Sequence, residues 1–112
     1  MNDRPSILFH FARRTDWANA QSAEAYQPHA FAQEGFIHCA TRAQIPGVIE
    51  RHLRGRLDLV RLTLDASRLE PWLKYEPSDR NGEHFPHVYG PIPMAAVISV
   101  ELFEPTAAEY GG

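Results

Sequence analysis

The chain has 112 residues, of which 44% are hydrophobic and 22% are charged, and its net charge is -3. This length and composition predict one globular domain over residues 1–112, with an ordered core at about 6–104 and a C-terminal tail at 105–112. The charge excludes the basic surface that non-specific nucleic-acid binding requires. One cysteine, no apolar run long enough for a bilayer and no signal peptide predict a cytoplasmic protein without a membrane partner. We therefore expect a small-molecule ligand.

The N-terminal half alternates between strand and helix patterns. A capping box formed by Thr41 and Gln44 predicts the start of a helix, and Gly55 follows the end of that helix. Thr15 or Asp16 can cap an earlier helix. The predicted elements are a strand at 6–11, a helix ending near 23, an irregular connection at 24–33, a strand at 34–40 and a helix at 42–53.

Strand patterns dominate the C-terminal half. Three prolines limit the strand content of residues 85–93, and an Asn-Gly pair marks an exposed, mobile loop at 78–83. The other predicted elements are an interior strand at 57–64, a turn at 65–69 begun by Asp65, a short strand at 72–76 and a last strand at 95–103.

The order of these elements predicts the fold class. Strands and helices mix early, strands dominate late, and no glycine-rich fingerprint follows any strand. We therefore expect an α+β domain with a small, twisted, mainly antiparallel sheet or a split pair of sheets, and two helices packed on it.

Three histidines stand where a ligand site is favoured. His10 and His38 each lie inside a strand among apolar residues, where an unpaired imidazole costs roughly 1–3 kcal/mol, so each is either a hydrogen-bonded structural residue or a ligand contact. His87 lies between two prolines and two residues before Tyr89, so an extended chain points both side chains in one direction. We expect a cleft that gathers these four residues.

Other residues have weaker patterns. Glu76 stands at a strand end, where its carboxylate is either solvated or able to orient a hydroxyl group or stabilise positive charge. Trp17 and Tyr26 are candidates for core or pocket wall, and Thr41, besides its role as a cap, is a candidate ligand contact. Cys39 follows His38 directly and so points to the opposite face of a strand, which favours a buried apolar filler over a nucleophile.

Zinc is a second possibility for the histidines, because His84 and His87 form a His-x-x-His pair that can join His38. A proline between the pair disfavours a helix that would bring both imidazoles onto one face. The sequence therefore implies no metal and no firm cofactor.

Two phrases carry a family resemblance. Glu-Gly-Phe-Ile-His-Cys-Ala-Thr at 34–41 and Phe-Pro-His-Val-Tyr-Gly-Pro at 85–91, with Leu-Phe-His at 8–10, resemble domain-of-unknown-function family 952. That family is similar to the ADP-ribosyltransferase-like fold, which includes toxin-like NAD users and tRNA 2′-phosphotransferases. The resemblance implies that His10 contacts a ribose and that His38 lines a nicotinamide pocket. Either His87 or Glu76 takes the position that stabilises the ribosyl cation.

The resemblance also implies an activity: transfer or hydrolysis at the nicotinamide ribose, with NAD as the substrate. His10, His38 and Tyr89 would hold the ligand, and Tyr26 or Trp17 would form a wall. Two alternatives stay open. One is a non-catalytic binding module for a phosphorylated or ribosylated ligand, and the other is a metal-dependent hydrolase that uses the histidines.

Overall fold

The computed structural model describes residues 4–77 and 82–103. Within them the chain forms an α+β fold in which all strand pairs are antiparallel. The first sheet has the order β1-β4-β8. Its strands are β1 (Ile7–Arg13), β4 (Leu59–Asp65) and β8 (Val97–Phe103). The interior strand expected at 57–64 is therefore confirmed as the central strand of this sheet.

A second sheet has the order β3-β6-β5, and a two-residue pair joins β2 to β7. The strands are β3 (Ile37–His38), β5 (Leu73–Pro77), β6 (His84–Val88), β2 (Ala25–Tyr26) and β7 (Ile92–Pro93). Pro86 lies in the middle of the central strand, where it lacks an N–H but its carbonyl accepts a hydrogen bond from the Cys39 N–H at 3.0 Å.

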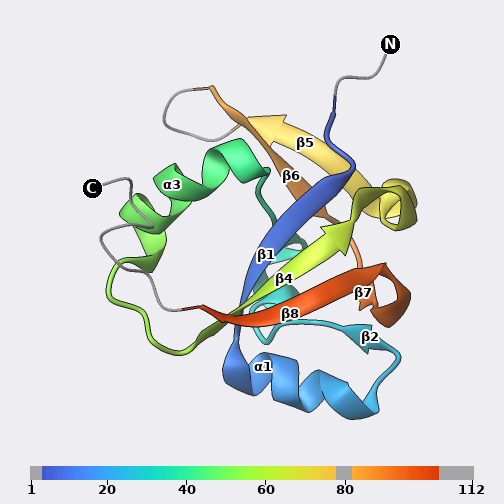
Figure 1. Cartoon of the computed structure of the whole chain (residues 1–112). Coiled ribbons are helices and arrows are strands. Elements are labelled where there is room, and N and C mark those ends of the chain that lie inside the picture. Colours follow the sequence, from blue (N-terminus) through green and yellow to red (C-terminus); the bar gives the residue numbers. More distant parts are fainter. Residues whose placement is uncertain (1–3, 78–81, 104–112) are drawn as a thin grey trace.

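The two sheets meet at β1. The Phe9 N–H donates to the Ala40 carbonyl and the Ala40 N–H donates to the Phe9 carbonyl, both at 2.8 Å. Ala40 lies two residues after the end of β3, so β1 stands between the two sheets (Figure 1). Of the two arrangements left open by the sequence, a single antiparallel sheet or a split pair, the structure has two separate three-stranded sheets, with the short β2-β7 pair beside them.

The helices are short. They are α1 (Arg14–Asn19), α2 (Phe31–Glu34) and α3 (Ile45–Val48), with short 3₁₀ turns at Ala20–Ser22, Ala66–Arg68, Glu70–Trp72 and Met94–Ala96. A 3₁₀ turn (Arg42–Gln44) precedes α3 and a π-helical turn (Ile49–Leu53) follows it, so the helix predicted at 42–53 is confirmed as one continuous helical segment. No helix among the described residues is long and apolar enough to cross a bilayer.

Several predicted boundaries are corrected. Neither Thr15 nor Asp16 caps α1, because the helix begins at Arg14 and both residues lie within its first turn. The Arg14 N–H donates to the Asp58 carbonyl at 2.8 Å. The strand predicted at 34–40 shrinks to β3, since Glu34 ends α2 and Gly35 follows at φ 80°. Most of the predicted loop at 78–83, and the predicted tail at 105–112, lie outside the described residues.

Two apolar clusters hold these elements. The larger one lies beneath both sheets and includes Leu8, Leu62, Leu64, Tyr26, Val88 and Ile92. The smaller one consists of Ile49, Leu53, Leu59 and Phe103, with Phe11 packed against it. It fixes the helical segment 42–53 against the first sheet and so positions one wall of the cleft described below.

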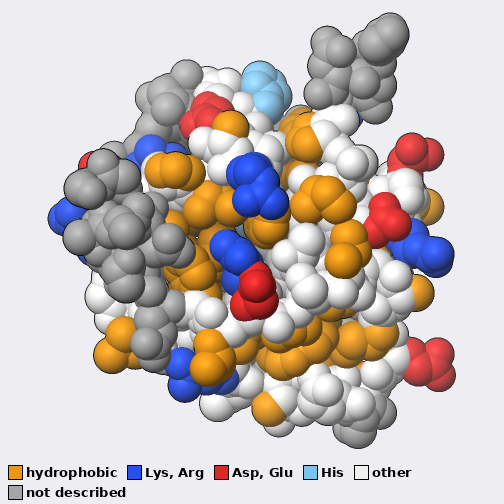
Figure 2. Space-filling model, viewed as in Figure 1, with side chains coloured by type: hydrophobic (Ala, Val, Ile, Leu, Met, Phe, Trp, Pro, Cys, Tyr) orange, Lys and Arg blue, Asp and Glu red, His pale blue; other side chains and the backbone are white. Residues whose placement is uncertain are grey.

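Strand β8 forms an edge of the first sheet. Its side chains Ile98, Val100 and Leu102 alternate with polar residues and are 55%, 39% and 73% exposed. Figure 2 shows apolar side chains gathered along this strand. None of the three lines the polar cleft, so this apolar strip is a separate surface.

A buried imidazole links β1 to β2 and β3. His10 is 7% exposed, its Nδ1 lies 2.6 Å from the His38 carbonyl oxygen, and its Nε2 lies 2.9 Å from the Tyr26 hydroxyl. A carbonyl only accepts, so Nδ1 carries the proton and Nε2 accepts from the Tyr26 O–H. Both ring nitrogens are thereby satisfied inside the protein.

Removing the Tyr26 hydroxyl is expected to destabilise the fold. In Tyr26→Phe the buried Nε2 of His10 loses its donor, which should lower the free energy of unfolding by about 1–3 kcal/mol in urea titrations. The matched control is Tyr75→Phe, because the Tyr75 hydroxyl is buried without a hydrogen-bond partner among the described residues. That variant should unfold at the same or a higher urea concentration, and equal losses in both variants would contradict the assignment.

Candidate functional site

A cleft of about 820 Å³ lies between the helical segment 42–53 and strands of both sheets. His10, His38 and His87, which are far apart in the sequence, all line it. The remaining lining residues are Phe9, Phe11, Glu34, Phe36, Cys39, Ala40, Val48, Arg51, His52, Leu53, Arg56, Pro77 and Phe85. The cleft is therefore aromatic and cationic, with a volume in the range of small-molecule sites.

The register of the second sheet places its polar side chains on one face. His38 pairs with His87, and His87 pairs with Lys74 on the other side. Opposite residues in an antiparallel pair share a face, and alternate residues along a strand do too, so Glu76 and Tyr89 lie on this same face. Ile37 and Val88 point into the larger core instead.

Aromatic rings pack tightly on this face. Phe36 stacks on His87 with ring centroids 4.2 Å apart and an interplanar angle of 23°. The His38 ring stands across His87 at 5.2 Å and 78°, and Tyr89 lies 5.3 Å from Phe36. The planes of the two imidazoles are thus fixed by neighbouring rings.

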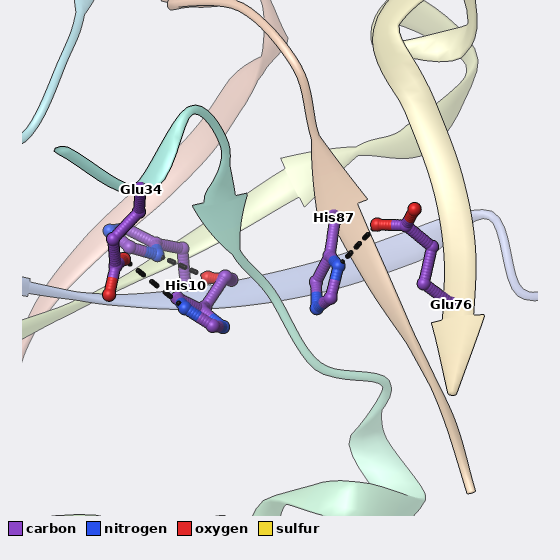
Figure 3. Close-up of polar contacts among 5 residues, drawn as sticks. His10, Glu34, Glu76 and His87 are labelled. Atoms are coloured by element: carbon purple, nitrogen blue, oxygen red, sulfur yellow. Dashed lines mark hydrogen bonds and ion pairs between the residues drawn. The ribbon is translucent and has the colours of Figure 1, made fainter. Parts of the chain in front are cut away.

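Glu76 holds both His87 and Tyr89. Its Oε1 lies 2.7 Å from His87 Nδ1 and accepts a hydrogen bond from the Tyr89 hydroxyl at 2.6 Å. Figure 3 shows Glu76 on β5 and His87 on β6 pointing toward one another. The hydrogen bonds from Tyr89 and His87 lower the pKa of the Glu76 carboxyl, and the bond to Glu76 raises the pKa of Tyr89. The common direction expected for residues 87 and 89 is confirmed by their shared partner.

His38 and His10 are joined through the backbone. The His38 carbonyl accepts from His10, while the His38 Nε2 lies 3.2 Å from Glu34 Oε1 on the exposed side. Burial lowers the pKa of His10 to about 4, so its ring is neutral at physiological pH. His10 therefore positions His38 and leaves no free ring nitrogen for a ligand.

The charges of the cleft favour an anion. Arg51 and Arg56 line it, against one lining carboxylate, that of Glu34. Arg56 is held by two hydrogen bonds of 2.8 and 2.9 Å to Asp58, whereas Arg51 forms no ion pair with any described residue and its guanidinium lies close to Gly47. A guanidinium so placed suits a phosphate or carboxylate group.

The other predicted site residues do not line this cleft, and Tyr89, which was expected to join the three histidines there, is among them. Tyr26 is fully buried against His10 and lines a smaller pocket of about 170 Å³, and Trp17 packs on Tyr26 at 5.9 Å. Thr41 begins the helical segment, where its N–H donates to Gln44 Oε1 at 3.0 Å. Cys39 is buried, and burial raises its pKa to about 12. Its thiol stays protonated, as expected for an apolar filler.

Sequence reasoning missed Phe36, Arg51 and Glu34 as site residues. Phe36 could have been found, because it stands two residues before His38 and so shares its face in an extended chain. Arg51 and Glu34 carry no comparable signal, since their placement depends on how the helical turns pack against the sheets. Among the described residues, no group of three or more His, Cys, Asp or Glu side chains could hold a metal ion.

Residues 11–100 match the family described as Protein of unknown function (DUF952), and the chain belongs to that family. A crystal structure of protein CC0527 from Caulobacter crescentus is similar, with 27% identity and a TM-score of 0.80 over 90% of this chain and 89% of that one. The solution NMR structure of CC0527 has 26% identity and a TM-score of 0.77 over 94% and 90% of the two chains. No curated protein matches this chain.

Protonation of His10 is expected to destabilise the protein in mild acid. The folded-state pKa of His10 is about 4, below its ordinary value of 6.5, so the stabilisation is complete above pH 6.5 and is lost as the pH falls toward 4. At 1.36 kcal/mol per pKa unit the loss is about 3 kcal/mol. Urea unfolding at a series of pH values measures it. His29→Gln, which changes an exposed imidazole, should keep this dependence, and constant stability between pH 7 and 5 would refute it.

Proposed function

We propose that the cleft binds a nucleotide-like anion such as NAD or ADP-ribose, and that the protein is an enzyme of ADP-ribosyltransferase-like type. The observation that carries this proposal is the meeting of the stacked Phe36–His87 pair and Arg51 in one cleft. The split pair of antiparallel sheets, with a histidine on the first strand, supports it as well.

The ligand groups can be matched to the cleft. A base or nicotinamide ring is flat and apolar on its faces, so it suits the aromatic side chains Phe9, Phe36 and Phe85. A pyrophosphate carries the charge that Arg51 is free to meet. The exposed His38 ring supplies a hydrogen-bonding group for a ribose hydroxyl, and His10 fixes the backbone that carries it.

The chemistry requires a carboxylate near the reacting sugar. As the bond from the ribose C1′ to the nicotinamide nitrogen breaks, the bonding electrons leave with nicotinamide and positive charge develops on the sugar. Glu34 is the carboxylate that lines the cleft, beside His38, whereas Glu76 lies behind His87. We therefore assign the stabilisation of that charge to Glu34 in place of Glu76 or His87.

A second candidate is binding without turnover. It is favoured by His10, whose ring nitrogens are both occupied by partners within the protein and so cannot contact a ribose. A module that recognises ADP-ribose would use the same aromatic and cationic groups but would leave NAD intact.

Truncating the aromatic wall should weaken binding. Phe36→Ala removes the ring that stacks on His87, and His38→Ala removes the ribose contact. Phe36→Ala should raise the Kd for ADP-ribose about tenfold or more, since base stacking contributes roughly 1–3 kcal/mol, and His38→Ala should raise it about threefold to tenfold, since one hydrogen bond contributes about 0.5–1.5 kcal/mol. Ligand-detected NMR titration measures the change, with near-ultraviolet circular dichroism as a folding check. The control His29→Ala lies outside the cleft and should bind as the wild type does, and unchanged binding in both cleft variants would refute the site.

Neutralising Glu34 should separate binding from chemistry. In Glu34→Gln the shape is kept but the negative charge is lost, so nicotinamide release from NAD, followed by chromatography, should fall about a hundredfold or more. The Kd for ADP-ribose should change little. Gln33→Ala, on the preceding exposed residue, is the control. ADP-ribose binding with no nicotinamide release by the wild type would instead support the binding module.

A further inference from the structure

We propose that Glu76 and His87 form a carboxylate–imidazole pair in which His87 Nε2 accepts a proton from a hydroxyl group or water bound in the cleft. The nature of the bound molecule rests on the proposed function, whereas the pair itself rests on geometry. Neither the family description nor the titles of the similar structures assign a role to either residue.

The hydrogen bond between the two side chains fixes the tautomer. A carboxylate has no proton to donate, so the 2.7 Å contact between Glu76 Oε1 and His87 Nδ1 requires the proton to be on Nδ1. The lone pair of the neutral ring is then on Nε2, at the edge of the ring away from Glu76 (Figure 3). Because His87 lines the cleft, Nε2 is the nitrogen available to a bound molecule.

The carboxylate is held in its charged form and in place. The Tyr89 hydroxyl donates to the same Oε1 at 2.6 Å, and the lowered pKa of Glu76 keeps it ionised at neutral pH. The ring of His87 is stacked on Phe36, and its side chain is 13% exposed. A base with a fixed plane, a fixed tautomer and a charged partner has the arrangement used for proton transfer in hydrolases and transferases.

The neighbouring imidazoles of the cleft lack this arrangement. His10 has both nitrogens bonded within the protein. His38 also contacts a carboxylate, that of Glu34, but at 3.2 Å, through Nε2 and on the exposed side, so its Nε2 is not the free nitrogen. His52 lines the cleft without a carboxylate in hydrogen-bond contact among the described residues. The charged and titratable groups around His87 are Glu76, Tyr89, His38 and, by register on β5, Lys74. Of these, Glu76 is the group in hydrogen-bond contact with the ring.

The proton transfer balances the chemistry proposed above. The oxygen of water or of an acceptor hydroxyl forms a bond to C1′ of the ribose while the bond from C1′ to the nicotinamide nitrogen breaks. The bonding electrons leave with neutral nicotinamide, and the O–H proton passes to His87 Nε2. Glu76 stabilises the resulting imidazolium without taking the proton, and so acts as a positioning residue.

The tautomer is the first test. Long-range ¹H–¹⁵N correlation spectra of the labelled protein at pH 8 should show His87 protonated on Nδ1 and unprotonated on Nε2. Glu76→Ala removes the acceptor, so the Nε2-protonated form should appear. Tyr89→Phe removes the other donor to Glu76 but keeps the His87 contact, and should retain the wild-type tautomer. Protonation of His87 on Nε2 in the wild type would overturn the proposal.

Access to Nε2 is the second test. Diethyl pyrocarbonate acylates unprotonated imidazole nitrogens, and peptide mass spectrometry gives a rate for each histidine. His87 should react faster than the buried His10 and slower than the exposed His29. A His87 as unreactive as His10 would show that Nε2 does not face the cleft, and would overturn the pair.

The same measurement separates this inference from the proposed function. Saturating ADP-ribose should slow His87 acylation at least fivefold while His29 is unchanged. Acylation of His87 without protection, together with the Nδ1-protonated tautomer, would support the pair and count against the nucleotide ligand. If the wild type cleaves NAD, His87→Gln should slow nicotinamide release about a hundredfold, and full activity in that variant would overturn proton acceptance by His87.

Discussion

The buried ring of His10 is the constraint on which the arrangement of the two sheets depends. An imidazole at this depth must satisfy both nitrogens, and its partners come from a two-residue strand on one side and from β3 on the other. The bond to the His38 carbonyl acts beside the Phe9–Ala40 bridge, so the chain that carries Phe36 and His38 is held against β1. The second sheet is anchored to the first by polar contacts as well as by the shared core.

That anchoring explains why the cleft is polar while the layer beneath it is apolar. Residues 37 and 88 point into the larger core, and the alternating residues on the same strands therefore point outward into the space beneath the helical segment 42–53. The residues of this outer face are either rings that stack on one another or groups that bond to a carboxylate. A protein with a net charge of -3 thereby forms a hollow in which two arginines face one lining glutamate.

Three histidines of the cleft, His10, His38 and His87, have different environments, and their chemistry differs for that reason. Burial keeps His10 neutral, and hydrogen bonds within the protein occupy both of its ring nitrogens. His87 is mostly buried, and a charged carboxylate directs its free nitrogen away from β5. His38 is the most exposed of the three and is held through its backbone. Similar residues in one cleft thus divide into a structural group, an oriented base and a ligand contact in the proposals made above.

Local patterns in the sequence determined the three strands of the first sheet, strand β5, the helical segment 42–53, the α+β class and the common direction of His87 and Tyr89, because periods of 2 and 3.6 residues depend on neighbours in the chain. They did not give β2 and α2, which lie in the connection expected to be irregular at 24–33, or β6, where Pro86 argued against a central strand. Glycine and capping residues also marked the ends of the helical segment 42–53. Only the tertiary structure decided three features: the partners of His10, the diagonal contact from Glu76 to His87, and the position of Arg51 at the cleft. Each depends on strand register or on packing between residues at least 11 positions apart, for which no local period exists.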